Sequence, residues 1–469
     1  MGTFIDDRLL ERASLAAKPC RFGRVKGLVG LRLEVEGITA AVGEGVRVWK
    51  DGSPLETEVV ALGPKKLYCM PYGDIKGVRL GTPAQALGRS LSIRVGRELL
   101  GRVLDGLGRP LDDGPSLAHL QQVPLDTSAP HPLERTLVTE QLSLGVRAID
   151  TLIPCGKGQR LGIFAGSGVG KSSLLSMIAR GTDADVSVVA LVGERGREVN
   201  EFLYHDLGDE GMSRSVVVVA TSDEPALVRL RAAFTATRIA EWFRDQGAHV
   251  VLMMDSLTRF AMAQREVGLS AGEPPASRGY PPSVFSLMPK LLERAGSGST
   301  GSITGLYTVL VEGDDMNEPV ADASRAILDG HIVLQRSLAT AGHFPSIDVL
   351  ESISRLEPAI CSNEQIAWAR EIRRLLAAYR DAKDLIEIGA YNQGANDLTD
   401  RAIAMREPIE AFLCQGLYER ATLDDSWQRL RALAESSKEL SASRASSRAG
   451  HPAGGVLSLQ EPSPTARSA

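Results

Sequence analysis

The chain has 469 residues, about three times the length of a typical domain, so we expect more than one domain. Its net charge of −5 and its aromatic content of 5% disfavour a nucleic-acid-binding surface, which is usually basic and rich in stacking side chains. No window reaches the roughly 18 apolar residues of a membrane span, and the acidic residues near the start are unlike a signal peptide. We therefore expect contact with a membrane only through partners.

The first 95 residues divide into a short leading segment and a β-rich region. Residues 1–20 are predicted to be a partner-binding segment with an amphipathic helix at 4–17, although a frayed terminus is an equal alternative. From 21 to 95, short β-rich runs are separated by Gly, Pro and Asp turns, a spacing that favours a small β-barrel. The predicted strands are 31–35, 46–49, 58–61 and 91–95.

The middle of the chain, from 96 to 361, alternates between apolar runs and helical stretches. A Gly- and Pro-rich connector is predicted at 101–115. The helical stretches include 172–180 and 224–246, and alternation of this kind predicts a parallel sheet covered by helices. The predicted strands are 160–165, 186–192, 215–220, 249–254 and 305–311.

The C-terminal part carries few strand signals. Residues 362–440 are rich in Ala, Leu, Glu and Arg and predict a helical domain, most clearly at 364–388. Residues 441–469 are rich in Ser, Ala, Gly and Pro, which predicts a disordered tail.

The cysteines are widely separated along the chain. No two have the spacing of a zinc site and their number is odd, which predicts reduced, mostly buried thiols in a cytosolic protein. They are Cys20, Cys69, Cys155, Cys361 and Cys414.

A phosphate-binding loop is predicted at 165–172, where AGSGVGKS follows an apolar strand and precedes a helix. Glycines let the backbone N–H groups turn toward phosphate oxygens, and the helix N-terminus adds positive charge. Lys171 is expected to bridge the β- and γ-phosphates, and Ser172 to bind Mg²⁺. Alone, the loop indicates only that ATP or GTP binds, and an ordinary Gly-rich turn is the alternative. The expected nucleotide-binding residues here are Ala165 (Gly in the strictest motif), Gly166, Ser167, Gly168, Val169, Gly170, Lys171, Ser172 and Ser173.

Two carboxylates end predicted strands. Asp255 ends the run HVVLMMD and is expected to hold Mg²⁺ through water, with helix capping as the alternative. Glu194 ends the run VSVVALVGE and is expected to orient and polarise an attacking water, with a charged surface loop as the alternative.

These motifs occur together with the triplet GER at 193–195 and the segment PSIDVLESIS at 345–354. From about residue 100 to 440 the chain resembles the catalytic subunits of the rotary ATP synthase family and their relatives, the type III protein-export ATPases. The resemblance implies an α/β fold with a RecA-like phosphate-loop ATPase core and a parallel sheet, an N-terminal β-barrel and a C-terminal helical domain. It implies that Glu194 is the water-polarising residue, with Arg195 beside it in the catalytic set, and that Asp255 is the Mg²⁺ aspartate.

The resemblance also assigns two residues near the Ser-x-Ser pair. Arg355 follows that pair directly and would be an arginine finger that reaches the neighbouring subunit's site. Without the resemblance, an ion pair between Arg355 and Glu351 is the preferred interpretation. Phe344 stands where the family places an aromatic side chain on adenine, and ordinary core packing is the alternative.

Within the family, the segments 270–296, 301–334 and 384–403 resemble export ATPases. We therefore expect a homohexameric ATPase, with ATP and Mg²⁺ as cofactors, in the cytoplasm at the inner face of the bacterial inner membrane. It would serve the flagellar export apparatus by unfolding substrates or releasing them from chaperones. The implied partners are a regulatory stator-like protein, export-gate membrane proteins, chaperones and substrates, and no nucleic acid.

Four alternatives remain at this stage. They are a virulence-type secretion ATPase, an ATP synthase subunit, a hexameric RNA helicase with an RNA-binding barrel, and a non-catalytic nucleotide-binding subunit.

Overall fold

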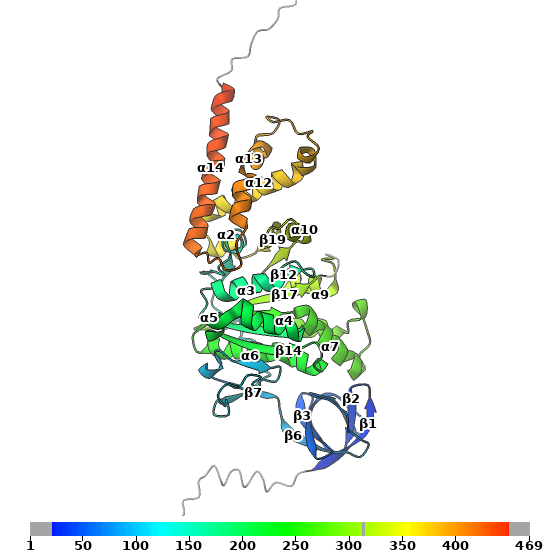
Figure 1. Ribbon diagram of the computed structural model, residues 1–469. Coiled ribbons are helices and arrows are strands. Elements are labelled where there is room, and N and C mark those ends of the chain that lie inside the picture. The colour runs from blue at the N-terminus through cyan, green and yellow to red at the C-terminus, as the bar shows by residue number, and fades with distance from the viewer. Residues whose placement is uncertain (1–20, 312–314, 450–469) are drawn as a thin grey trace, which may run out of the picture.

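The computed structural model describes residues 21–311 and 315–449. Figure 1 shows a β-barrel, a central layer of strands and helices, and a group of C-terminal helices arranged along the length of the molecule. This confirms the predicted fold class. The predicted helix at 4–17, Cys20 and the partner-binding segment 1–20 lie outside the described residues.

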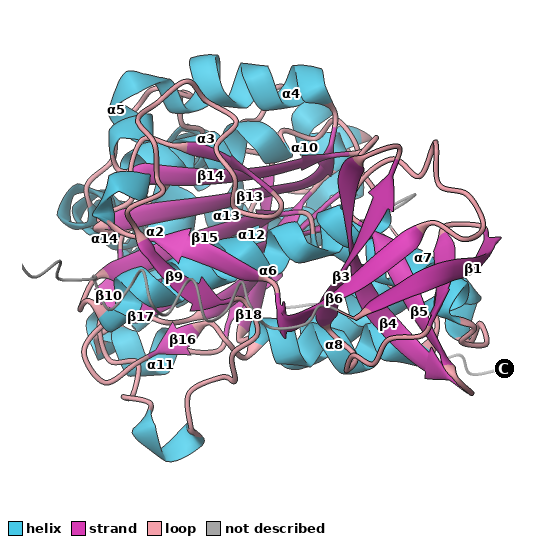
Figure 2. Ribbon diagram, turned by 90° about the horizontal axis from the view of Figure 1, so that it is seen from below, coloured by secondary structure: helices cyan, strands magenta, loops and turns pink. Residues whose placement is uncertain are grey.

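The barrel consists of six antiparallel strands that close in the order β1-β2-β5-β4-β3-β6. Figure 1 shows the barrel as a ring, and Figure 2 shows its strands from the side. Alternate residues point inward, so that Leu33 and Val35 of β2 and Val46 and Val48 of β3 fill the interior. The strands are β1 (Phe22–Val29), β2 (Arg32–Glu36), β3 (Glu44–Lys50), β4 (Ser53–Gly63), β5 (Lys66–Pro71) and β6 (Pro83–Ser90).

The prediction that residues 91–95 belong to the barrel is wrong. Strand β7 (Ser92–Val95) pairs with β9 (Gln121–Pro124) in a separate two-stranded sheet. The reason is packing, because Ile93 and Val95 are buried in the hydrophobic cluster of the central layer. The predicted connector at 101–115 likewise contains a short strand, β8 (Val103–Asp105), which pairs with the edge of the central sheet.

The central layer is a nine-stranded sheet with the order β19-β18-β12-β17-β15-β13-β14-β8, and β16 pairs with β17. Neighbours from β18 to β8 are parallel, as the β/α alternation predicted, whereas β19 is antiparallel to β18. The strands are β12 (Arg160–Ala165), β13 (Val186–Glu194), β14 (Ser215–Thr221), β15 (His249–Asp255), β16 (Gly296–Ser297), β17 (Ser302–Leu310), β18 (Gly330–Leu334) and β19 (Ile347–Ser354), with the small pair β10 (Gln141–Leu142) and β11 (Cys155–Gly156) outside this sheet.

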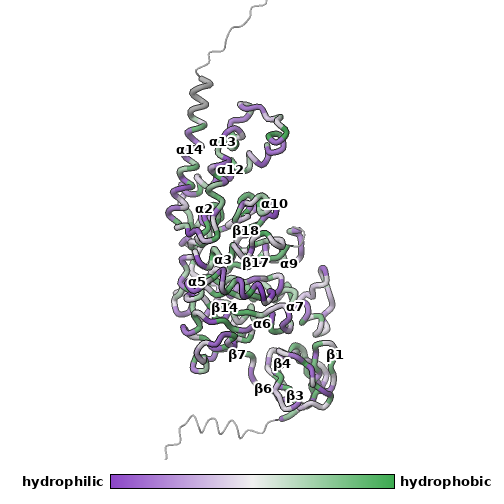
Figure 3. The backbone as a smooth tube through the Cα atoms, viewed as in Figure 1, coloured by the Kyte–Doolittle hydropathy of each residue, from purple (hydrophilic) through white to green (hydrophobic). Residues whose placement is uncertain are grey.

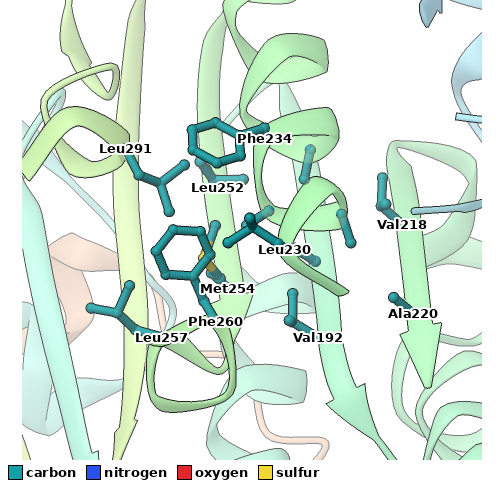
Figure 4. Packing of buried hydrophobic residues seen from close by; sticks show 14 of the residues in the cluster. Val192, Val218, Ala220, Leu230, Phe234, Leu252, Met254, Leu257, Phe260 and Leu291 are labelled. Atoms are coloured by element: carbon teal, nitrogen blue, oxygen red, sulfur yellow. The ribbon is translucent and has the colours of Figure 1, made fainter. Parts of the chain in front are cut away.

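Hydrophobic side chains cover both faces of the central sheet, which is why its strands are continuously apolar. On one face, Leu252 and Met254 of β15 lie beside Phe234 of α6 and Phe260 of α7 (Figure 4). Met253 points to the opposite face, toward α2 and α3. The helices of this layer are α2 (Arg147–Leu152), α3 (Lys171–Gly181), α4 (Gly196–Glu201), α5 (Gly208–Ser213), α6 (Ala226–Asp245), α7 (Leu257–Ala271), α8 (Pro282–Leu292), α9 (Pro319–Ile327), α10 (Arg336–Thr340) and α11 (Glu357–Ile360).

A buried ion pair joins the barrel to the central layer. Glu58 of β4 and Arg231 of α6 are in contact, and their side chains are only 6% and 12% exposed. Tyr72 of the barrel donates its hydroxyl hydrogen to the same carboxylate. The barrel therefore meets α6 through charge pairing as well as apolar packing.

Three helices form the C-terminal part: α12 (Asn363–Glu387), α13 (Asp397–Leu413) and α14 (Leu423–Ala449). Much of α12 and α13 is hydrophilic, as Figure 3 shows. The prediction that disorder begins at 441 is wrong for residues 441–449, because α14 continues through them. Their Ala and Arg residues favour helix, and no Gly or Pro occurs between Leu423 and Ala449. No helix in the described part of the chain is long and apolar enough to cross a membrane.

Candidate nucleotide-binding site

A cleft of about 650 Å³ lies at the carboxyl ends of the central strands, where the loop after β12 leads into α3. Ligands of open parallel sheets bind at this end of the strands. The residues that line it are Ala165, Gly166, Ser167, Gly168, Gly170, Lys171, Ser172, Ser173, Glu194, Arg195, Glu198, Arg259, Leu310, Val311 and Arg336.

The loop has the backbone of a phosphate cradle. Gly168 and Gly170 adopt φ values of 74° and 93°, a conformation that favours glycine. Between them, Val169 is buried in the hydrophobic cluster, and its carbonyl oxygen accepts a hydrogen bond of 2.6 Å from Ser346 Oγ. Helix α3 begins at Lys171 without a side-chain cap, so its first N–H groups remain available to an anion.

The structure brings Lys171 and Asp255 into contact. Lys171 Nζ is hydrogen-bonded to Asp255 Oδ1, and the same oxygen accepts a hydrogen bond of 2.8 Å from Thr308 Oγ1 of the intervening strand β17. Helix capping, the alternative for Asp255, is performed instead by Ser256, whose side chain accepts from Arg259 N. The carboxylate of Asp255 therefore faces the phosphate loop, and the hydrogen bond from Thr308 of the neighbouring strand holds it there.

Glu194 ends β13 at the other side of Lys171, with 3.6 Å between its Oε1 and Lys171 Nζ. Burial and the charge of Asp255 raise the pKa of Glu194 to about 7, although Lys171 acts in the opposite direction. Its buried Oε1 has no hydrogen-bond partner among the described residues. A carboxylate with this pKa and a free acceptor is suited to hold and polarise a water molecule.

Arginines surround the cleft. Arg195 directly precedes α4, makes no capping hydrogen bond and is exposed, with its guanidinium 3.4 Å from Glu198. Arg259 of α7 and Arg336 of α10 also line the cleft, and sequence reasoning missed both. Arg259 lies one turn after Asp255, but a single basic residue in a helix gives no specific signal. These cations make the cleft suitable for a polyanion.

Phe344 lies beside the loop. Its ring is 3.7 Å from the position that a Cβ atom would take at Gly170. The side chain of Phe344 is 48% exposed, which does not fit the alternative of core packing. The ring is therefore available as an apolar surface next to the cradle.

Arg355 is not brought to this cleft. It follows β19, which runs antiparallel to β18, so that Gly330 pairs with Ser354 at the end of the sheet opposite the phosphate loop. Its guanidinium donates to Arg325 O over 3.1 Å and is not paired with Glu351. Glu351 instead forms an ion pair of 2.7 Å with Arg380 of α12.

The cradle, the basic lining and the two strand-end carboxylates fit a nucleoside triphosphate with a divalent cation. Among the described residues, no group of three or more His, Cys, Asp or Glu side chains gathers as a metal site. This donor set suits Mg²⁺, because Mg²⁺ is usually bound by one or two carboxylates together with phosphates and water.

Comparison with known proteins identifies the family of this chain. Residues 145–354 match the ATP synthase alpha/beta family, nucleotide-binding domain, and residues 361–432 match the T3SS EscN ATPase C-terminal domain. The chain is 50% identical to the flagellum-specific ATP synthase of Bacillus subtilis over 88% of its length and 95% of that protein. It is 46% identical to the type 3 secretion system ATPase of Xanthomonas euvesicatoria over 91% of its length and 96% of that protein.

One solved structure is the assembled ATPase EscN in complex with its central stalk EscO, from the type III secretion system of enteropathogenic E. coli. It superimposes with a TM-score of 0.82 and 44% identity, over 88% of this chain and all of that one. The chain therefore belongs to the ATP synthase alpha/beta family and, within it, to the ATP-hydrolysing enzymes of flagellar and type III protein export.

Proposed function

We propose that this enzyme acts as a homohexameric ring at the base of the flagellar export apparatus and uses ATP hydrolysis to unfold export substrates or release them from chaperones. The observation that carries the ring is the separation of the site into two halves. Lys171, Glu194 and Asp255 converge on the phosphate loop, whereas Arg355 lies at the opposite end of the same sheet. A neighbouring subunit can supply the missing arginine, and the assembled state of EscN supports such an arrangement.

Within each site, the residues of the loop hold the phosphates through backbone N–H groups, and Lys171 leaves Asp255 to bridge the β- and γ-phosphates. Glu194 accepts a hydrogen bond from the attacking water and orients it toward the γ-phosphorus. Arg355 of the next subunit and Arg195 stabilise the charge that develops on the phosphoryl oxygens. Phe344 packs on adenine.

Mg²⁺ is the proposed cofactor. When bound it neutralises charge on the phosphates, and Ser172 and Asp255 are the residues that would hold it. Thr308 supports this role, because its hydrogen bond keeps the Asp255 carboxylate facing the loop.

We place the ring in the cytoplasm, at the inner face of the bacterial inner membrane, and held there by partners. The complex of EscN with its central stalk supports a stalk-like partner for this ring. The other proposed partners are a stator-like regulator, export-gate proteins, chaperones and substrates. The similarity to flagellum-specific relatives favours the flagellar system, and the similarity to the secretion ATPase of Xanthomonas euvesicatoria keeps a virulence-type system as the second candidate.

Deletion of the gene separates the two systems. We expect loss of flagellar filaments with intact effector secretion, and complementation by the wild-type gene but not by Lys171→Ala. Loss of effector secretion with intact filaments would assign the enzyme to the virulence-type system instead.

A further inference from the structure

The segment between α13 and α14 contacts α2 and α3 of the central layer, and α3 directly follows the phosphate loop. Figure 1 shows the lower end of α14 beside α2. Arg147 of α2 donates to Phe412 O and Cys414 O, and Arg180 of α3 donates to Leu417 O over 2.7 Å. Near the start of this segment, Gln415 is 5% exposed. Its side chain makes three hydrogen bonds to backbone atoms.

The partners of Gln415 fix the orientation of its amide. Oε1 accepts from Arg147 N over 2.9 Å, and Nε2 donates to Gly145 O and Glu419 O over 2.8 Å and 2.9 Å. Both amide hydrogens are used, and a flipped amide would place an oxygen against two carbonyl oxygens. An apolar side chain here would leave buried backbone groups without partners.

The backbone of Gln415 holds the turn that carries Phe344. Gln415 N donates to Phe344 O over 2.9 Å, and two residues later Ser346 Oγ donates to Val169 O of the phosphate loop. Phe344 is half exposed beside Gly170, so packing covers only part of its ring. Hydrogen bonds from the C-terminal segment and to the phosphate loop hold the backbone that carries it.

We propose that Gln415 is a positioning residue that holds Phe344 in place to pack on the base of ATP, so that the C-terminal helices contribute to nucleotide affinity. The proposal rests on the adenine contact of Phe344 proposed above. Gln415 touches neither phosphates nor base; it acts through the backbone of Phe344.

The test is a double-mutant cycle between Gln415 and Phe344 in the full-length assembled enzyme, read as KM for ATP and kcat. Phe344→Ala keeps the backbone acceptor and removes the ring. We expect Gln415→Leu to raise KM about fivefold, the size of one typical hydrogen bond, with kcat unchanged. In the Phe344→Ala background the same change should alter KM by less than about twofold, because the ring it positions is gone.

Gln141 provides a matched control. It also joins α2 to the C-terminal helices, by donating to Asp150 O and accepting from Trp427 Nε1, but it has no contact with Phe344. Gln141→Leu should lower the thermal midpoint and leave KM unchanged. Gln415→Glu, which keeps the size and the acceptor but loses both donated hydrogen bonds, should raise KM as Gln415→Leu does, and it replaces that variant if Gln415→Leu does not fold.

Three results would overturn the proposal. The first is that Phe344→Ala raises KM for ATP whereas the Gln415 variants have the KM of the wild type. The second is an effect of Gln415→Leu that persists undiminished without the ring, or that Gln141→Leu reproduces. The third is an unchanged KM in Phe344→Ala, which would remove the adenine contact itself and the role of Gln415 with it.

Discussion

Because the phosphate loop and Arg355 lie at opposite ends of one sheet, two inactive variants with lesions in different halves should restore each other's activity. Arg355→Ala retains an intact loop with Glu194, and Glu194→Gln retains an intact Arg355. In a ring, a subunit of the first kind next to a subunit of the second kind completes one site. Neither variant completes a site with copies of itself.

The size of the recovery follows from the head-to-tail arrangement. If subunits mix at random in equal amounts, half of the loops are intact and half of the facing arginines are intact, so about one quarter of the sites are complete. The background is low, because removal of an arginine finger costs about 10³–10⁵ in rate and removal of a general base about 10²–10⁴. Recovered turnover should vary as the product of the two fractions and peak at equal amounts.

The assay is phosphate release from ATP after the variants are mixed as subunits and then allowed to assemble. The matched control is a mixture of Lys171→Ala with Glu194→Gln, in which both lesions affect the same half and no recovery is expected. If the first mixture shows only the sum of the two separate activities at every ratio, Arg355 does not act across a subunit interface and the reasoning is refuted.

Three further outcomes are expected. Glu194→Gln should bind ATP as tightly as the wild type in equilibrium titration while losing turnover; unchanged turnover would remove Glu194 from the mechanism. Arg231→Met should destabilise the protein by about 3–5 kcal/mol, because it leaves Glu58 buried without its ion pair. As a control, Arg229→Met breaks a more exposed ion pair and should cost below about 1 kcal/mol. Equal losses of unfolding free energy in denaturant titrations would contradict this difference. Burial raises the pKa of Asp150 from 3.8 to about 7, so the folded state holds a proton that the unfolded state has lost, and stability should fall as pH rises between these values. In thermal unfolding measured as a function of pH, Asp150→Asn should make the midpoint fall less steeply. If the slope is the same as in the wild type, other groups cause the fall.

The parts of the site that the sequence could predict are encoded locally. The phosphate loop is one continuous motif, and Glu194 and Asp255 each end an apolar strand. Because parallel strands end at one edge of a sheet, their convergence on Lys171 could be anticipated.

The remaining contacts depend on residues that are distant in the sequence. Ser346 meets Val169 across 177 positions, and Gln415 meets Gly145 across 270. No periodicity or spacing indicates such pairs. Glu351 illustrates the same limit: its spacing from Arg355 favours a local ion pair, but the fold brings Arg380 of α12 to it instead.

The closed barrel affects how copies of this protein can pack against one another. Its six strands close on themselves, so the described barrel has no open strand edge along which another chain could add by backbone hydrogen bonding. Exposed apolar side chains such as Phe22, Val29 and Leu80 can still form contacts between neighbouring barrels. Contacts made by side chains alone can be released and formed again, whereas extension of a sheet is a route to irreversible aggregation. Many copies can therefore be packed closely together at one place in the cell without the barrels merging into a common sheet.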